Sequence, residues 1–304
     1  MSAHTHTTGA DAPPDPRRWL ALGILLIANF MNLIDVTIVN VALPSMRDGL
    51  GATDSQIEWV IAAYILAFAL GLLPFGRLGD ILGRTRLFLW GVAGFTAASA
   101  LCGLAPNIEF LIAARTIQGL AGAMMTPQVL AIATVTFPSH ERGQAFSLFG
   151  LSAGLASVCG PILGGALISA NLFGMDWQPI FLVNIPIGIA AVVAGWFLIP
   201  RLPGHAGLRN DYVGIVLFGL GIVAVVFPIV EGRAYGWPLW AFGMIATGLL
   251  LLVSFVLWTR GRAAAGAPQL LNFDLITNRQ FMFGAVVVTV YASGIPGFFM
   301  VISL

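Results

Sequence analysis

Long apolar runs recur along the whole chain, and they restrict its fold more than any other feature of the sequence. Nine segments are apolar over about the 20 residues that a helix needs to cross a bilayer. They are residues 19–43, 56–76, 86–105, 109–136, 143–168, 179–200, 212–231, 237–258 and 279–304. Charged residues make up only 9% of the chain, whereas soluble domains carry about 25%. The sequence therefore predicts an all-α integral membrane protein with about nine transmembrane helices.

Arginine is distributed unevenly among the segments that connect these runs. With a cytoplasmic N-terminus, the cytoplasmic side would hold Arg17, Arg18, Arg77, Arg84, Arg86, Arg142, Arg201, Arg209, Arg260, Arg262 and Arg279. The segments on the other side hold only Arg47 and Arg233. Because basic residues collect in cytoplasmic loops, we predict a multi-pass protein of the cell inner (plasma) membrane with a cytoplasmic N-terminus. The net charge of +1 gives no indication of a nucleic-acid partner.

A short polar stretch separates the second and third runs and reads GRLGDILGRTR. Its spacing is G-x-x-x-D-x-x-G-R, formed by Gly76, Asp80, Gly83 and Arg84. A connection this short makes the two flanking helices antiparallel neighbours. Asp80 lies three residues after Arg77 and four before Arg84, so it can pair with either arginine. We therefore predict a short cytoplasmic loop at residues 76–86.

Two charged residues lie far from the ends of apolar runs, Asp35 in the first and Arg115 in the fourth. A charge at membrane depth is costly and usually faces a partner or a cavity. At 1.5 Å per residue, Asp35 lies about 12 Å and Arg115 about 9 Å from the outer ends of their helices. The similar depths allow an ion pair, although the sequence does not show that these two helices are neighbours. Asn32 and Gln118 lie three residues away on the same helix faces.

The fifth run is rich in glycine and contains a proline, in GLSAGLASVCGPILGGAL at 150–167. Gly160, Gly164 and Gly165 belong to a smooth face that allows close helix packing. Pro161 removes a backbone donor and bends the helix. Ordinary packing of small residues also explains this pattern, so the run alone does not indicate a function.

Together these motifs resemble those of the fourteen-helix drug:proton antiporters of the major facilitator superfamily, the QacA/EmrB type. The matching stretches are DVTIVNVALP from Asp35, the loop motif from Gly76, R-x-x-Q-G from Arg115, G-P-x-x-G-G from Gly160 and IFLVNIPIG at 180–188. They occur in the helices and in the order that the family has. Two positions depart mildly from its pattern, Thr85 after the loop arginine and Ala156 before Gly160.

The resemblance implies a role for each motif. Asp35 and Arg115 are expected to couple transport to protons, and Asn32 and Gln118 to line the substrate cavity. The cytoplasmic gate is expected at Gly76, Asp80, Gly83 and Arg84. The antiporter motif consists of Gly160, Pro161, Gly164 and Gly165 and is expected to provide a bend and a sliding face that limit leak.

The resemblance also implies how the chain is divided. The family has six N-terminal helices, two linker helices and six C-terminal helices, with the substrate cavity between the two halves. We therefore expect a disordered cytoplasmic tail at 1–18, a six-helix bundle at 19–200 and a linker with two transmembrane helices at 201–278. Residues 279–304 are expected to be the first helix of an incomplete C-terminal bundle, which a second chain could complete.

The leading hypothesis is a proton-coupled efflux antiporter of organic, lipophilic or cationic compounds such as drugs or antibiotics. Its expected partners are a small-molecule substrate, protons and the lipid bilayer. We expect no enzyme activity, no catalytic residues, no cofactor and no metal, since only Asp35 and Arg115 place polar chemistry at one depth. Two alternatives stay open: a truncated fragment or partner-requiring subunit without transport of its own, and a transporter of a specific metabolite in the same superfamily.

Overall fold

The computed structural model describes residues 16–171, 174–205, 207, 210–271 and 273–302, with side chains as far as Val290 apart from Ile276. Residues 1–15 of the predicted tail (1–18) lie outside this description. Within it, every regular element is a helix, which confirms the predicted all-α class. The helices are α1 (Arg18–Leu50), α2 (Asp54–Leu82), α3 (Arg84–Gly103), α4 (Ile108–Thr136), α5 (Ser139–Ser169), α6 (Pro179–Leu182), α7 (Asn184–Leu198), α8 (Tyr212–Glu231), α9 (Leu239–Ala264), α10 (Phe273–Thr277) and α11 (Arg279–Ile302).

Eight spans in the described part are long and apolar enough to cross a membrane, with α6 and α7 together forming one of them. They correspond to the first eight predicted runs, and the apolar helix α11 lies at the ninth. Side chains fix where several helices begin. The Thr53 hydroxyl accepts the Gln56 N–H at 3.3 Å at the start of α2. Asp211 accepts the Gly214 N–H at 3.0 Å at the start of α8, which satisfies a backbone donor that the helix leaves free.

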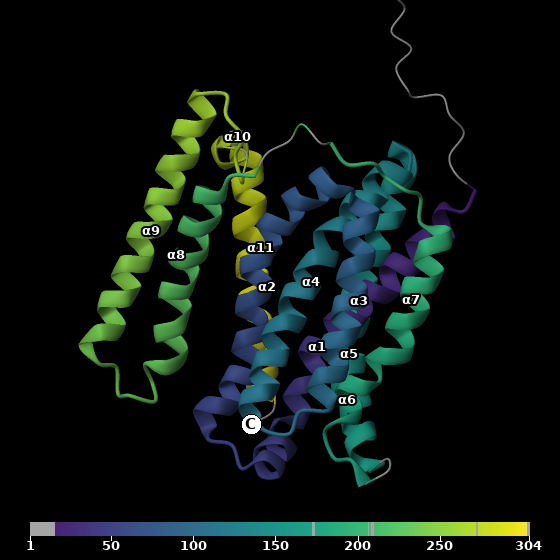
Figure 1. The fold of residues 1–304 in the computed structure, drawn as a ribbon, viewed down its shortest axis with the longest axis vertical. Helices are drawn as coiled ribbons and strands as arrows, with labels where there is room; N and C mark the ends of the chain where they lie inside the picture. Colours follow the sequence, from purple (N-terminus) through teal and green to yellow (C-terminus); the bar gives the residue numbers. More distant parts are fainter. Residues whose placement is uncertain (1–15, 172–173, 206, 208–209, 272, 303–304) are drawn as a thin grey trace, which may run out of the picture.

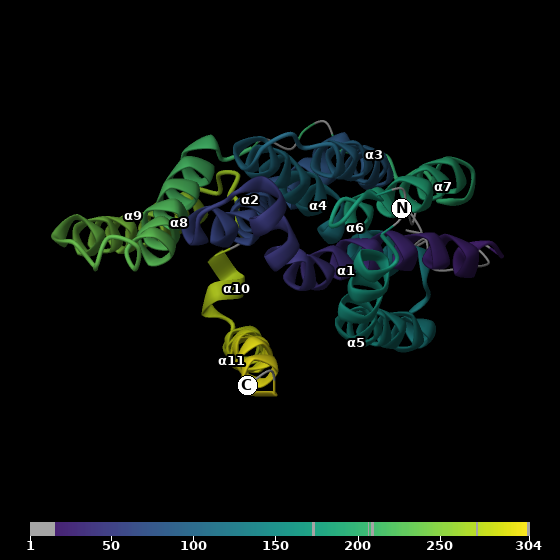
Figure 2. The same ribbon diagram turned by 90° about the horizontal axis from the view of Figure 1, so that it is seen from below.

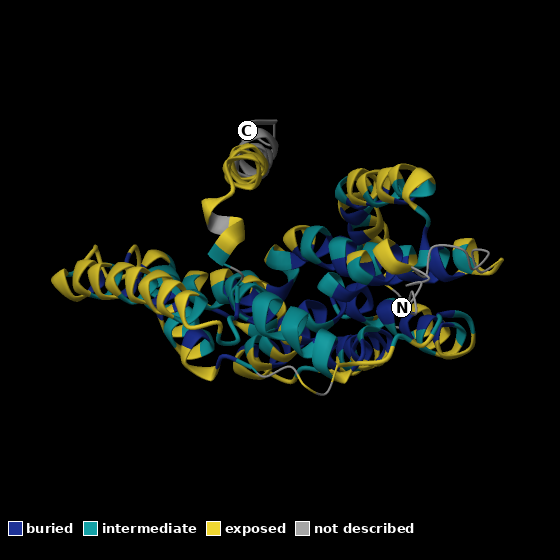
Figure 3. Cartoon of the chain, turned by 90° about the horizontal axis from the view of Figure 1, so that it is seen from above, coloured by how far each residue is buried: buried dark blue, intermediate teal, exposed yellow. Residues whose placement is uncertain are grey.

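The most buried helices are α1, α3 and α4, which belong to a bundle that also contains α2, α5 and the α6–α7 pair (Figure 3). Phe88, Phe95 and Met125 are fully buried in its apolar core. Large apolar side chains of α9, such as Leu239 and Leu250, are exposed instead. Exposed apolar side chains suit helices that face lipid, because lipid tails are as apolar as leucine.

A single residue joins the second and third helices. Because α2 continues to Leu82 and α3 begins at Arg84, only Gly83 lies between them. The predicted loop at 76–86 is therefore wrong in extent, since Gly76 and Asp80 belong to α2. Gly83 has a φ of 100°, and a Cβ there would lie 2.8 Å from the Leu202 carbonyl oxygen. Glycine alone accepts this conformation and this contact readily, so one residue makes the reversal.

The chain that leaves the bundle crosses this joint, and we call residues 200–205 the crossing segment. The Thr85 hydroxyl donates to the Pro200 carbonyl at 2.6 Å and accepts the Leu202 N–H at 3.3 Å. The His205 N–H donates to the Asp80 carbonyl at 2.8 Å. The crossing segment is therefore fastened to the end of α2 and to the start of α3.

The sixth predicted span, 179–200, is interrupted. Val183 separates α6 from α7. Pro186 has no N–H to donate to the carbonyl of Leu182, so the helical hydrogen bonding fails at this turn. The break places Asn184 at the start of α7, where its side chain is buried in the bundle. Irregular backbone at membrane depth is tolerated where protein buries it or where it lines a cavity.

The helices α8 and α9 form an antiparallel hairpin alongside α2 (Figure 1). Glu231, the last residue of α8, accepts hydrogen bonds from Trp59 Nε1 and, at 3.1 Å, from Ser55 Oγ of α2. At the other end of the hairpin, Asp211 accepts the Trp258 Nε1–H of α9 at 3.0 Å. Figure 2 shows α11 standing apart from the bundle.

Candidate functional site

Asp35 lies at the centre of a polar cluster inside the bundle, and its side chain is 0% exposed. Its Oδ2 atom accepts from Arg115 in an ion pair between α1 and α4. Its Oδ1 atom accepts from Gln118 Nε2 at 2.8 Å and from Asn184 Nδ2 at 3.4 Å. The ion pair that the depths in the sequence allowed is therefore present, and α4 and α7 supply the immediate partners of Asp35.

The Arg115 guanidinium is held from several sides and is 1% exposed. Its Nε donates to the Val60 carbonyl of α2 at 3.1 Å, and its Nη1 donates to Gln118 Oε1 at 2.6 Å. Its central carbon lies 4.1 Å from the centroid of the Tyr64 ring, a favourable cation–π arrangement. Because arginine keeps its proton in proteins, Arg115 supplies a fixed positive charge beside Asp35.

Gln118 extends the cluster to α3. Its Nε2 also donates to Ser99 Oγ at 2.8 Å, and its Oε1 accepts from Cys102 Sγ at 3.5 Å. Asn184 Nδ2 donates to the same Ser99 Oγ at 3.3 Å. Most of the cluster's polar atoms are thus paired within it, as buried polar groups usually are.

A second branch of the cluster runs from Tyr64 to α4. The Tyr64 hydroxyl donates to Asn32 Oδ1 at 2.5 Å, and Asn32 Nδ2 donates to Thr126 Oγ1 at 3.4 Å. Gly122 permits this approach, because a Cβ there would lie 2.7 Å from Asn32 Oδ1. Asn32 and Gln118 are therefore both buried in the cluster, and the predicted role of each in lining a substrate cavity stays a prediction.

The predicted gating residues lie around the joint of α2 and α3. Arg84 Nε donates to Asp80 Oδ1 at 3.0 Å, and Arg84 Nη1 donates to the Ala131 carbonyl of α4 at 3.3 Å. Of the two pairings that the sequence allowed for Asp80, the structure contains the one with Arg84. Gly76 faces α4, since a Cβ there would lie 3.8 Å from Pro127. The joint is thus tied to α4 as well as to the crossing segment.

Gly160 and Gly164 of the antiporter motif pack α5 against α1. A Cβ on Gly160 would collide with the Thr37 hydroxyl, and one on Gly164 would lie 2.9 Å from Ile38 Cγ1. The Thr37 hydroxyl also donates to the Ala156 carbonyl at 3.1 Å. The close helix packing predicted from the glycine-rich run is therefore present at these two glycines.

The other two residues of this motif lie outside that contact. Pro161 is exposed, and no described atom lies within 4 Å of the position of a Cβ on Gly165. The motif therefore divides into a packed pair, which faces α1, and an open pair.

Several members of the cluster were not identified as site residues from the sequence, among them Tyr64, Ser99 and Asn184. A signal existed for Asn184, which is an asparagine two residues before a proline inside an apolar run. Tyr64 carries the only side-chain hydroxyl in the second apolar run, which is a weaker signal. Ser99 stands among other small residues, and nothing in the sequence marks it as buried.

The sequence and the fold both match known membrane transporters. Residues 25–212 match the family model of the Major Facilitator Superfamily. The chain is 42% identical over 297 residues to a probable actinorhodin transporter of Streptomyces coelicolor, which covers 98% of this chain and 51% of that protein. It is 31% identical over 303 residues to the tetracenomycin C resistance and export protein of Streptomyces glaucescens, with coverages of 98% and 54%.

A bacterial homologue of the human lysosomal transporter Spinster, crystallised in an inward-facing and occupied conformation, has a similar fold. The TM-score is 0.56 at 19% identity, over 83% of this chain and 62% of that one. At this identity the likeness concerns the fold alone. The chain belongs to the Major Facilitator Superfamily and is a multi-pass membrane protein. It spans about half the length of the curated relatives it matches.

Proposed function

We propose that this chain forms the proton-coupling part of an efflux antiporter. The antiporter exports organic compounds that are lipophilic or cationic, such as drugs or antibiotics. The observation that carries the proposal is the buried pair of Asp35 and Arg115. The printed names of two relatives, a transporter and a resistance and export protein, support the export of small molecules. Transport needs no covalent step, so we propose a transporter rather than an enzyme.

In this proposal Asp35 binds and releases the transported proton. The ionised carboxylate is attracted to Arg115, which stays charged throughout. A proton on Asp35 removes that attraction and leaves Arg115 buried without its counter-charge, which is strongly unfavourable. The contacts between α1 and α4 must then change. In this way the protonation of Asp35 is coupled to the packing of α1 against α4.

The remaining motifs are proposed to act on the conformational change. The joint of Asp80, Gly83 and Arg84 would hold a cytoplasmic gate, and Gly160 and Gly164 would let α5 slide on α1. In this arrangement the N-terminus is cytoplasmic and the bundle at 19–200 carries the coupling site. Residues 201–278 are a linker, and 279–304 begin a second bundle. Transport would take place between the two bundles, as in transporters that rock one repeat against another.

The test is proton-driven efflux of ethidium from vesicles that contain the chain. We expect Asp35→Asn and Arg115→Ala to reduce efflux under a proton gradient to the rate of protein-free vesicles. The matched control is Asp54→Asn, because Asp54 forms an exposed ion pair with Arg47 near the start of α2. Gradient-driven efflux that persists unchanged in Asp35→Asn would contradict the coupling role.

The same assay separates the two readings of how the chain works. If the wild-type chain gives no efflux, we would add the second half of a relative as a separate chain. Efflux that returns with this addition, and only with an intact Asp35, would identify the chain as a subunit that requires a partner. Efflux by the wild-type chain alone would contradict that second reading.

A further inference from the structure

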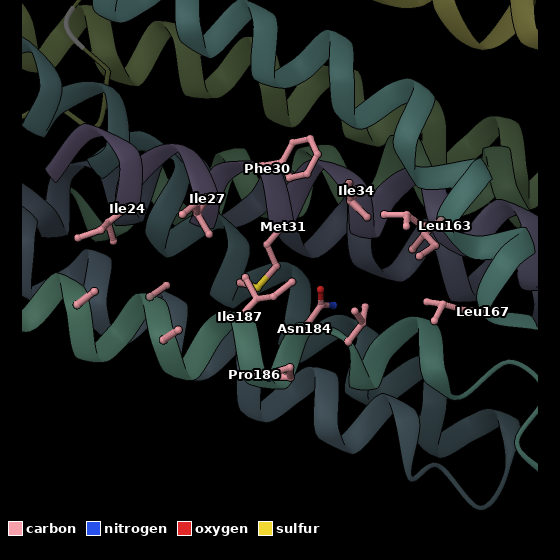
Figure 4. Close-up of a pocket in the computed structure, with 15 residues that line it drawn as sticks. Ile24, Ile27, Phe30, Met31, Ile34, Leu163, Leu167, Asn184, Pro186 and Ile187 are labelled. Atoms are coloured by element: carbon pink, nitrogen blue, oxygen red, sulfur yellow. The ribbon is translucent and has the colours of Figure 1, made fainter. Parts of the chain in front are cut away.

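A cavity of about 670 Å³ lies between α1, α5 and the α6–α7 pair (Figure 4). Small-molecule sites typically have volumes of about 300–1,000 Å³. The wall includes Ile27, Phe30 and Ile34 of α1, Leu163 and Leu167 of α5, and Ile187 of α7. Among its described lining residues, only Asn184 has a polar side chain. The cavity is therefore an apolar space with one polar point.

Two contacts join α1 and α5, which form two of the walls of this cavity. Near the start of both helices, Arg18 donates to the two carboxylate oxygens of Glu141 at 2.7 and 2.8 Å. Further along, the packed pair Gly160 and Gly164 lies against α1. A bidentate ion pair and a close glycine contact thus hold α1 against α5 in this conformation.

The two ends of the Asn184 amide meet different surroundings. The nitrogen donates to Asp35 and to Ser99. The oxygen accepts no hydrogen bond from any described residue, although the residue is only 2% exposed. Figure 4 shows this side chain among the apolar side chains that line the cavity. Because this residue is almost completely buried and its amide oxygen has no donor among the described residues, the cavity offers a ligand one unmet hydrogen bond.

We infer that this cavity binds a neutral, lipophilic compound with one hydrogen-bond donor, and that the Asn184 amide oxygen accepts that donor. The inference rests on the proposed function, because it defines the class of compound that the transporter exports. An ionised ligand does not fit, since the described wall supplies no counter-charge and burial of an unpaired charge is costly. A lipid acyl chain could fill the apolar wall but would leave the amide oxygen unmet.

This position places the ligand one residue from the proposed proton site. Asn184 lines the cavity and also donates to Asp35, so the same amide contacts both. A ligand that forms a hydrogen bond with Asn184 therefore alters the hydrogen bonding of the Asp35 carboxylate without contacting that carboxylate.

The test measures binding of 2-phenylindole and 1-methyl-2-phenylindole to the full chain in nanodiscs, by fluorescence titration against empty nanodiscs. The two probes are neutral, and only the first has an N–H donor. We expect 2-phenylindole to bind about threefold to tenfold more tightly, as one net hydrogen bond allows. We expect Asn184→Leu, which replaces the amide with an apolar group, to remove this preference while the methylated probe still binds.

Two substitutions on α7 locate the bound probe. Ala190 is exposed and lines the cavity, so Ala190→Phe should weaken binding of both probes. Val193 is exposed on the same helix and is not among the cavity-lining residues, so Val193→Phe should leave both unchanged. A thermal unfolding curve for each variant shows whether it folds. If Asn184→Leu does not fold, the inference is still tested by the preference of the wild-type chain for 2-phenylindole and by the effect of Ala190→Phe on binding.

Equal affinities of the two probes for the wild-type chain would overturn the inference, as would a preference that persists in Asn184→Leu. Binding unaffected by Ala190→Phe would place the probes elsewhere and would overturn it too. The titration uses no proton gradient. A failure of probe preference therefore leaves the efflux test intact, and a failure of efflux leaves the titration intact.

Discussion

Asp35 and Arg115 are buried charges that are stable in this bundle because each has the other as a partner. Removing one member of such a pair costs about 3–5 kcal/mol, because the other charge is left buried and uncompensated. Replacing both members with neutral groups of similar volume is often close to neutral. The stability of the bundle should therefore depend on the match between the two residues more than on either alone.

We expect Arg115→Gln to lower the thermal stability of the detergent-solubilised chain more than the double variant Asp35→Asn/Arg115→Gln does. The double variant leaves no unpaired buried charge. The measurement is the fraction of folded protein by size-exclusion chromatography after heating. Arg47→Gln is the control, since its exposed pair with Asp54 contributes little. A double variant that is less stable than the single one would show that the unpaired charge is not the main cause of the stability loss.

The sequence identified the charged members of the site and the uncharged Asn32 and Gln118, but it did not identify Tyr64 or Asn184, and the reason is physical. A charge inside an apolar run is rare and needs a partner, so Asp35 and Arg115 stand out. A tyrosine or an asparagine in such a run can equally well point to lipid headgroups or to another helix. Tyr64 and Asn184 face the interior of the bundle because of how the neighbouring helices pack. The residue pattern of one helix does not show which helices pack against it.

At the scale of single elements, the glycines of α5 differ in what surrounds them. Gly160→Ala should destabilise the chain by about 1–3 kcal/mol, because the added methyl group collides with Thr37 of α1. Gly165→Ala should be neutral or stabilising by up to about 1 kcal/mol, because alanine favours a helix and space is open there. Thermal unfolding of the two variants in the same detergent checks this. Equal shifts would mean that α5 does not pack on α1 in this way.

The joint between α2 and α3 gives a second comparison of glycines. Gly83 has a φ of 100° and lies against the Leu202 carbonyl, whereas Gly51 has a φ of 61° with no described atom near a Cβ. An L-residue in the left-handed region costs about 1–2 kcal/mol, so Gly51→Ala should have an effect of that size. Gly83→Ala adds a collision and should lower the unfolding temperature further. A smaller effect at Gly83 than at Gly51 would contradict the close contact.

The positions of the helices could be predicted from hydropathy, but their ends could not. The second apolar run stops at residue 76 because polar residues follow, whereas α2 continues to Leu82 since those residues are still helical. Hydropathy indicates which residues can contact lipid, whereas the ends of a helix are set by its backbone hydrogen bonds. The interruption at Val183 has the same origin, because an apolar run hides a break that a proline causes.

At the scale of the whole molecule, the hairpin of α8 and α9 is held to the bundle at few points, and Glu231 is one of them. Glu231→Ala should therefore raise amide hydrogen exchange in residues 212–264 and leave exchange in α3 and α4 unchanged. The matched control is Arg233→Ala, an exposed residue two positions later. Exchange that stays slow in the hairpin after Glu231→Ala would show that apolar contacts with α2 hold it without this residue.

The class of the whole molecule could be predicted because composition and motif order are properties of the chain alone. The placement of the hairpin beside α2 and of α11 away from the bundle depends on contacts between residues far apart in the sequence. Glu231 and Trp59 illustrate this, since neither residue marks the other in the sequence. The predicted segment boundaries at residues 200 and 278 give the order of the segments along the chain. They do not give the arrangement of those segments in space.

The crossing segment has a consequence for the order in which the chain is built. Synthesis proceeds from the N-terminus, so α2 and α3 have left the ribosome long before residues 200–205 are made. Until then the Thr85 hydroxyl and the Asp80 carbonyl lack the partners that they have in the finished molecule. A nascent chain that ends before residue 205 therefore carries an incomplete joint at Gly83. The hairpin of α2 and α3 therefore reaches its final form only after α7, the last helix of the bundle, has been synthesised.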